Sequence, residues 1–150
     1  MNLVFSVLDL LVIVVALKAK PLGNVPYRWG VYMGGSAALL ALRLILYAVA
    51  AMGDRTQGIA ELLVILIAAL AALGSVGLLL RRKFGIMALA VAYAVLLAAA
   101  RFLDAQGIFP SNPRYQPLST TGFSILLGAF AVYAFANAVY FKERWKLLAP

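Results

Sequence analysis

The sequence contains neither cysteine nor histidine among its 150 residues. Their absence excludes disulfide bonds, thiol catalysis, Cys/His zinc sites and histidine-based acid–base chemistry. Acidic residues are also scarce, with five Asp and Glu against thirteen Lys and Arg. The sequence shows no paired carboxylates and no nucleophile–base set, so we predict that the protein is not an enzyme and has no catalytic residue, metal or cofactor. A bound lipid or pigment stays open.

Hydrophobic residues, by contrast, make up 65% of the chain, and the mean hydropathy is +1.00. This composition excludes a soluble globular domain and predicts a single transmembrane helical domain, residues 1–150. The net charge of +8 would suit nucleic-acid binding only if the cations formed a patch on a soluble fold. Here they punctuate apolar segments, so we predict no nucleic-acid partner and expect contacts with anionic lipid head groups at the cytoplasmic face.

The apolar runs predict an all-α integral membrane protein with five transmembrane helices. The cations Arg81, Arg82 and Lys83 separate two runs that are each long enough to cross a hydrocarbon core of about 30 Å. The first run is shorter than the usual span of about 20 residues, so the alternative is four spans with an interfacial first helix. The predicted spans cover residues 2–17, 29–52, 59–80, 84–103 and 118–141.

Polar and proline-rich segments separate these spans. Residues 18–28 contain Pro21 and Pro26, and residues 104–117 contain three prolines, which predicts an irregular loop on the membrane surface. Ser119 and the two threonines that follow offer N-caps for the fifth span.

The distribution of cations predicts the orientation. With five spans, nine Lys and Arg fall on one side of the membrane, against Arg55 and Arg114 on the other. Positively charged loops stay in the cytoplasm, so we predict an outside N-terminus and a cytoplasmic C-terminus in a bacterial cytoplasmic (inner) membrane. The nine topology determinants are Lys18, Lys20, Arg28, Arg81, Arg82, Lys83, Lys142, Arg144 and Lys146.

Small residues recur at four-residue spacing on several spans, and in lipid such stripes let helices approach closely. We expect these faces to point inward or toward partner chains, with Ala90, Ala94 and Ala98 as the best case. An amide within a span bridges helices more often than it binds a substrate. The predicted packing residues are Gly30, Gly34, Ala90, Ala94, Ala98, Ala134, Ala138 and Asn137.

Two ionisable residues, Asp9 and Arg43, fall near the middle of their spans. A lone charge there costs roughly 2.5–3.5 kcal/mol on insertion scales, so we predict that the two side chains form an intramembrane polar pair between the first and second spans. The pair is interpreted as a structural strut, with a substrate or ion pathway as the alternative. Nearer the outer boundary, Arg101 is expected to pair with Asp104, and Glu61 is expected to contact interfacial water and Arg55.

Three functions are compatible with these features. The first is a non-catalytic accessory subunit of a larger membrane complex of respiratory, photosynthetic or secretion type. It packs through small-residue helix faces, and a hetero-complex is favoured over a homo-oligomer. The alternative is a small oligomeric transporter or channel with Asp9 and Arg43 in its pathway. An enzyme acting on lipid ranks last because the sequence offers no catalytic set.

Overall fold

The computed structural model describes residues 2–51, 58–105 and 119–150, and the description that follows is confined to them. Within these ranges the chain is all-helical, with five helices and no strand, which confirms the all-α part of the predicted fold class. Four of the helices are long and apolar enough to cross a membrane, and the first is shorter, an arrangement compatible with a helical membrane protein. The helices are α1 (Asn2–Leu17), α2 (Arg28–Ala51), α3 (Ile59–Leu79), α4 (Lys83–Ala105) and α5 (Thr120–Arg144).

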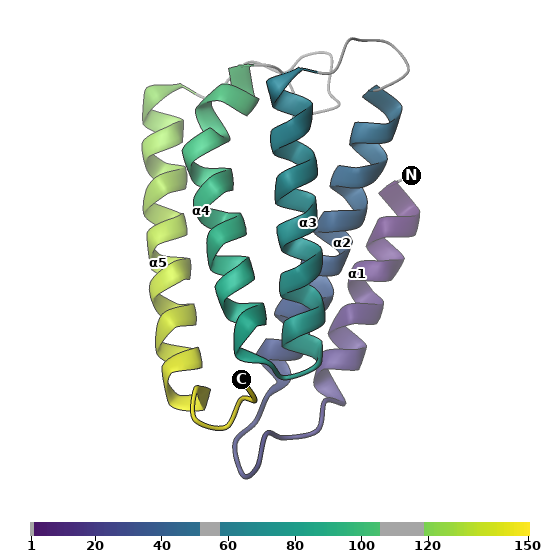
Figure 1. The fold of residues 1–150 in the computed structure, drawn as a ribbon, viewed down its shortest axis with the longest axis vertical. Helices are drawn as coiled ribbons and strands as arrows, with labels where there is room; N and C mark the ends of the chain where they lie inside the picture. The colour runs from purple at the N-terminus through teal and green to yellow at the C-terminus, as the bar shows by residue number, and fades with distance from the viewer. Residues whose placement is uncertain (1, 52–57, 106–118) are drawn as a thin grey trace.

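The helices stand side by side with their axes close to parallel (Figure 1). The main helix contacts join α2 to α3 and α3 to α4, while α1 contacts α2. The α1 and α5 helices therefore form the two edges of the bundle. The N-terminal end of α1 lies partway along the length of α2 (Figure 1). The α1–α2 loop, the α3–α4 turn and the C-terminal segment gather at one end of the bundle, which we call the basic end.

Local sequence fixes several helix ends. The Ser119 hydroxyl accepts a hydrogen bond of 3.1 Å from the Gly122 amide, so the predicted N-cap of α5 is confirmed. At the start of α3, a Glu61 carboxylate oxygen accepts a hydrogen bond of 2.9 Å from the Gly58 amide. The role of Glu61 is therefore to satisfy a backbone donor at a helix end, where an acidic group also suits the helix dipole.

The α3 helix ends with a left-handed residue that is not glycine. Arg81 has φ of 59°, the Arg82 amide donates to the Gly77 carbonyl at 2.7 Å, and the Arg81 amide donates to the Leu78 carbonyl at 3.1 Å. This is a Schellman motif, which satisfies carbonyls that the helix end leaves unpaired. The left-handed conformation costs an L-residue about 1–2 kcal/mol. The side-chain contacts of Arg81, described below, offset this cost.

Glycines determine where the central helices come closest. A Cβ added to Gly77 would fall on the backbone of Gly85, and a Cβ added to Gly34 would lie 3.1 Å from Leu79. These positions hold α3 against α4 and α2 against α3 near the basic end. Close backbone approach of this kind is how helices associate in lipid, where no hydrophobic effect drives them together.

The face of α4 that packs on α3 differs from the predicted one. Ala90, Ala94 and Ala98 are exposed within the chain, and the buried positions of α4 are Gly85, Leu89, Ala92, Ala99 and Leu103. The Ala90–Ala98 face therefore does not pack on α3, and its contact with a partner chain stays a prediction. Spacing alone did not distinguish two faces of α4 that are both rich in small residues.

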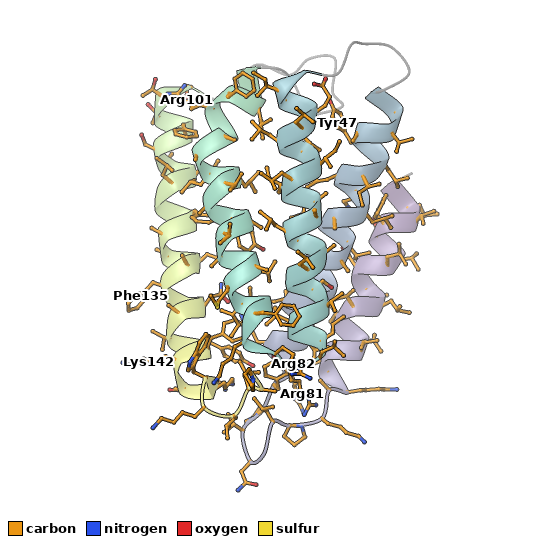
Figure 2. The ribbon with its side chains drawn as sticks, in the orientation of Figure 1. Tyr47, Arg81, Arg82, Arg101, Phe135 and Lys142 are labelled. Carbon is orange, nitrogen blue, oxygen red and sulfur yellow. The ribbon has the colours of Figure 1, made fainter. Side chains whose placement is uncertain are left out.

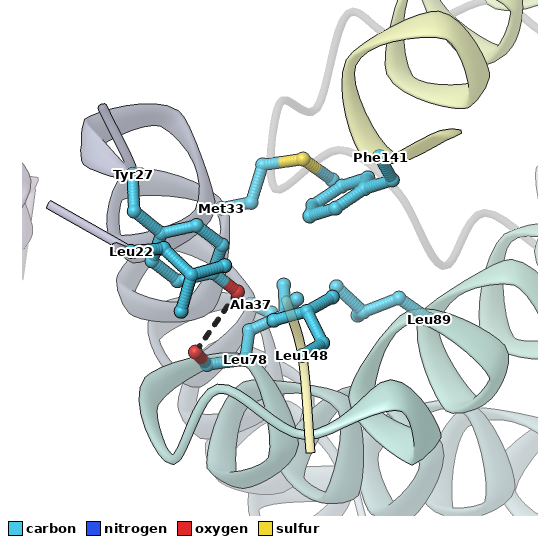
Figure 3. Close-up of a cluster of buried hydrophobic side chains, with 8 residues drawn as sticks. All are labelled: Leu22, Tyr27, Met33, Ala37, Leu78, Leu89, Phe141 and Leu148. Carbon is cyan, nitrogen blue, oxygen red and sulfur yellow. Dashed lines mark hydrogen bonds between the residues drawn. The ribbon is translucent and has the colours of Figure 1, made fainter. Parts of the chain in front are cut away.

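A cluster of buried side chains closes the basic end (Figure 3). It combines residues from the α1–α2 loop, all four helices α2–α5 and the C-terminal segment, so it joins parts of the chain that are far apart in sequence. The backbone of the C-terminal segment is held there too, because the Lys83 amide donates to the Ala149 carbonyl at 2.9 Å and the Ala149 amide donates to the Arg81 carbonyl at 3.1 Å. The cluster consists of Leu22, Tyr27, Met33, Ala37, Leu78, Leu89, Phe141 and Leu148.

Candidate functional site

The structure brings Asp9 of α1 and Arg43 of α2 together. A guanidinium nitrogen of Arg43 lies 2.7 Å from a carboxylate oxygen of Asp9, within hydrogen-bond distance. The same guanidinium lies over the ring of Phe5, one helical turn before Asp9, at 4.7 Å from the ring centre. Arg43 therefore binds two side chains of α1, one through charge and one through a cation–π contact.

This ion pair lies on the flank of the bundle. The side chain of Arg43 is 44% exposed and that of Asp9 is 49% exposed, so about half of each is covered by the described part of the chain. Nearby, α1 approaches α2 closely, since a Cβ added to Gly35 would lie 2.6 Å from a methyl carbon of Val12. The tight crossing at Gly35 positions the two ionic side chains against each other while leaving their outer halves open.

A second feature is an apolar cavity of about 360 Å³ between α4 and α5. Its lining is almost entirely apolar, and Figure 3 shows part of its wall, where Met33 and Phe141 face Leu78 and Leu89. Five of the predicted packing residues line it, and Ala98 and the two glycines of α2 do not. These five are Ala90 and Ala94 from α4, and Ala134, Asn137 and Ala138 from α5.

The α5 helix stands apart from its neighbours over most of its length. Its buried side chains are Phe141 and Arg144, both near its C-terminal end, while Phe135 points away from the bundle (Figure 2). Aromatic contacts hold it to α4, because the ring of Tyr93 lies 5.8 Å from that of Phe130 and 6.0 Å from that of Tyr133. These rings keep α5 at a distance from α4 and so maintain the cavity.

Polar contacts connect α5 to the rest of the bundle at other levels. The Trp29 indole N–H donates to the Asn137 side-chain oxygen at 2.7 Å, and the Asn137 amide donates to the Tyr133 carbonyl at 2.8 Å, so Asn137 bridges α2 and α5. Near the opposite end, the Arg101 guanidinium lies 4.7 Å from the centre of the Phe123 ring. The predicted partner of Arg101, the side chain of Asp104, lies outside the described residues.

The nine predicted topology determinants lie in the segments at the basic end. Arg81 and Arg82 are labelled there in Figure 2, as is Lys142, whereas Arg101 lies at the opposite end. Arg81 donates to the Pro21 and Lys20 carbonyls at 2.9 Å each, so it secures the α1–α2 loop. The two cations expected on the other side of the membrane, at positions 55 and 114, lie outside the described residues.

Two of the basic-end contacts fasten the start of α2. Arg144 is nearly buried and donates to the Pro26 carbonyl at 3.0 Å, while the fully buried Tyr27 donates its hydroxyl hydrogen to the Leu78 carbonyl at 3.2 Å. Burial raises the pKa of Tyr27 to about 12; the proximity of Tyr140 adds to this, and the positive charge of Arg81 opposes it. The hydroxyl therefore stays protonated and keeps its hydrogen bond at any physiological pH.

Sequence reasoning missed three of these features. The sequence did contain a signal for the close crossing at Gly35, namely two adjacent glycines. In the structure Gly34 faces α3 and Gly35 faces α1. The buried role of Tyr27 had none, since a tyrosine beside Arg28 is also typical of a membrane boundary. The cavity had none either, because it depends on how far α5 stands from α4.

No family model, curated protein or solved structure matches this chain. Within residues 2–51, 58–105 and 119–150, no group of three or more acidic side chains is placed to hold a metal ion.

Proposed function

We propose that this protein is a non-catalytic accessory subunit of a larger membrane complex, of respiratory, photosynthetic or secretion type. In this proposal all five helices cross the membrane, the N-terminus lies outside, and the basic end faces the cytoplasm of a bacterium. The observation that carries the proposal is the half-exposed ion pair between Asp9 and Arg43 on the α1–α2 flank.

An ionisable side chain at mid-membrane depth normally faces the interior of a helical bundle, a partner helix or a water-filled cavity. Asp9 lies eight residues from the basic-end terminus of α1, or about 12 Å at the helical rise, which places it well inside the hydrocarbon. The apolar cavity of the chain lies at the other edge, between α4 and α5. A helix of another chain seated on α1 and α2 would cover the outer halves of both side chains.

The exposed surface of α1 supports the same proposal. Leu10, next to Asp9, is 63% exposed, and Ile13, one helical turn after Asp9, is 44% exposed. A partner helix would gain apolar packing from these side chains and a polar contact from the ion pair. Packing and interhelical hydrogen bonds are the forces that associate helices in lipid.

The transporter alternative places the same two residues in a pathway. Because the pair lies at an edge of this chain, such a pathway would have to run between two copies. An adduct between copies would therefore favour the transporter, and an adduct with a different chain would favour the accessory subunit.

The test is site-specific photocross-linking in the native membrane at natural abundance. A photoreactive amino acid replaces Leu10 on α1 or, as a matched control, Val132 on α5, which is also apolar and is 71% exposed. We expect a protein adduct of one discrete mass from position 10 and none of that mass from position 132. The adduct should disappear in the double variant Asp9→Asn with Arg43→Gln, while the variant still inserts into the membrane.

Three results would contradict the proposal. Adducts with lipid alone at position 10 would show that no chain covers this flank. Equal protein adducts at positions 10 and 132 would show non-specific crowding. An adduct that has the mass of two copies of this chain would support the oligomeric transporter instead.

A further inference from the structure

The cavity between α4 and α5 has the length of one membrane leaflet. Its lining runs along α4 from Ile86 to Leu97, eleven residues or about 17 Å at the helical rise, and along α5 from Phe141 to Phe130. Half of a hydrocarbon core of about 30 Å is about 15 Å. The cavity therefore begins near the basic end and extends to about the middle of the membrane.

Its volume decides which apolar object fits. A helix about 10 Å across and 17 Å long occupies roughly 1,300 Å³, more than the empty space of about 910 Å³ that the walls of the cavity and its open side enclose. A partner helix could enter only if α5 moved away, which would break the contacts of Tyr93 with the α5 rings and of Trp29 with Asn137. An alkyl chain that runs along the membrane normal has the required length and is thin enough.

A cation lies close to the basic-end limit of the cavity lining. Lys83 begins α4 and lies three and seven residues before Ile86 and Ala90, so it shares a helix face with the cavity lining. Its ammonium group lies 5.6 Å from the centre of the Trp145 ring. In the described part of the chain the ion pairs are Asp9–Arg43 and Glu143–Arg144, so no carboxylate neutralises Lys83.

From these observations we propose that an anionic phospholipid binds between α4 and α5. One acyl chain fills the cavity, and the phosphate of the head group lies between the basic-end termini of α4 and α5, where the Lys83 ammonium binds it beside the Trp145 indole. Charge selects the lipid class, because a cation at the membrane boundary attracts an anionic head group, and an indole is suited to the head-group level. Small side chains at Ala90, Ala94, Ala134 and Ala138 leave the space that the acyl chain occupies.

The experiment uses the full chain purified in mild detergent. Phosphatidylglycerol and phosphatidylcholine with identical acyl chains are added separately, and bound lipid is counted by native mass spectrometry while the melting temperature is recorded. We expect phosphatidylglycerol to bind at least tenfold more tightly than phosphatidylcholine and to raise the melting temperature more.

Two pairs of variants locate the site. Ala94→Phe fills the cavity and should reduce phosphatidylglycerol binding at least tenfold, whereas Ala98→Phe, on the same helix but outside the cavity lining, should bind as the unchanged protein does. Lys83→Gln should bring phosphatidylglycerol affinity down to that of phosphatidylcholine, whereas Lys18→Gln, at the same end but in the α1–α2 loop, should keep the preference. Circular dichroism of each variant without added lipid verifies that it is folded.

Equal binding of the two lipids would overturn the anionic head-group assignment, as would a preference that survives Lys83→Gln. Equal binding by Ala94→Phe and Ala98→Phe would overturn the location of the acyl chain. If Ala94→Phe does not fold, Ala134→Leu, which adds bulk from the opposite wall, replaces it and must show the same loss of binding.

Discussion

The ion pair between Asp9 and Arg43 allows a quantitative prediction about stability. Asp9→Asn removes the carboxylate and leaves the guanidinium without its ionic partner at mid-membrane depth, and Arg43→Gln leaves the carboxylate in the same situation. A lone charge at a helix centre costs roughly 2.5–3.5 kcal/mol on insertion scales. Because the two side chains are 44% and 49% exposed, we discount this cost by about half, to about 1.5 kcal/mol for each single variant.

The double variant should behave differently. The attraction between two charges at 2.7 Å is about 6 kcal/mol at an effective dielectric constant of about 20, and placing both charges in the membrane costs roughly 5–7 kcal/mol; the same discount by about half for exposure brings each of the two terms to about 3 kcal/mol. The two terms nearly cancel, so the neutral pair should be within about 1 kcal/mol of the original protein. The double-mutant cycle formed by the two single variants and the double variant then has a coupling energy of about 2–3 kcal/mol. This value is at the upper end of the range for residues in contact.

The assay is unfolding of the purified protein in mixed micelles by increasing SDS, followed by tryptophan fluorescence for all three variants. Phe5→Leu is the control, because it removes the ring beneath Arg43, keeps the ion pair and should cost only about 0.5–1 kcal/mol. If Asp9→Asn alone leaves the free energy of unfolding unchanged, the pair is not a strut between α1 and α2. A double variant that loses the sum of the two single losses would refute the coupling.

Three further predictions concern packing, the basic end and orientation. Gly77→Ala should destabilise the protein by about 1–3 kcal/mol in the same assay, because the added methyl group disrupts the α3–α4 contact. The control Gly128→Ala, whose added methyl group meets no atom within 4 Å, should be neutral or stabilising by up to about 1 kcal/mol. Equal effects of the two substitutions would contradict the close approach of α3 and α4. Tyr27→Phe should cost about 0.5–1.5 kcal/mol, because it removes one hydrogen bond to the Leu78 carbonyl while the Arg81 amide still donates to the same oxygen; no loss at all would mean that the hydroxyl contributes nothing to stability. Between pH 10 and 12 the protein with Tyr27 should lose about 1.4 kcal/mol of stability per pH unit more than the variant does, because the unfolded state releases the Tyr27 proton near pH 10 and the folded state near pH 12. For orientation, single cysteines at Ser111 and at the C-terminus of this cysteine-free chain should be labelled by an impermeant reagent in intact cells only at Ser111; labelling of the C-terminus would reverse the proposed topology.

Much of the fold followed from composition and spacing. The apolar runs predicted five helices, and the structure has helices at all five, with ends within three residues of those expected. Such agreement is expected because backbone groups in lipid must be satisfied within the segment, which leaves a long apolar run little choice but a helix. The helix ends could be predicted where the sequence has a local signal, as at the N-cap Ser119. The largest difference between a predicted and an observed end is at Arg144, because α5 continues beyond the apolar run.

Which helix faces pack together was decided by tertiary structure. In α4 both the Ala90–Ala98 face and the face with Gly85 and Ala92 are rich in small residues, and only the second packs on α3. Helices in lipid are apolar on all sides, so hydrophobic patterning gives no preference, and the closest backbone approach selects the face. The aromatic contacts of Tyr93 with α5 then set a separation that no pattern within one helix encodes.

The sequence by itself determined that Asp9 and Arg43 are the residues whose placement in the membrane costs free energy. Their positions along the apolar runs are enough to place each charge near the middle of a span. It also determined that all the cations except Arg43 and Arg101 lie in the segments between and after the predicted spans. Only the tertiary structure decided that the ion pair is half exposed at the edge of the bundle and that an apolar cavity lies at the other edge. Both facts depend on the distances between helices, and these are set by side chains from different helices acting together.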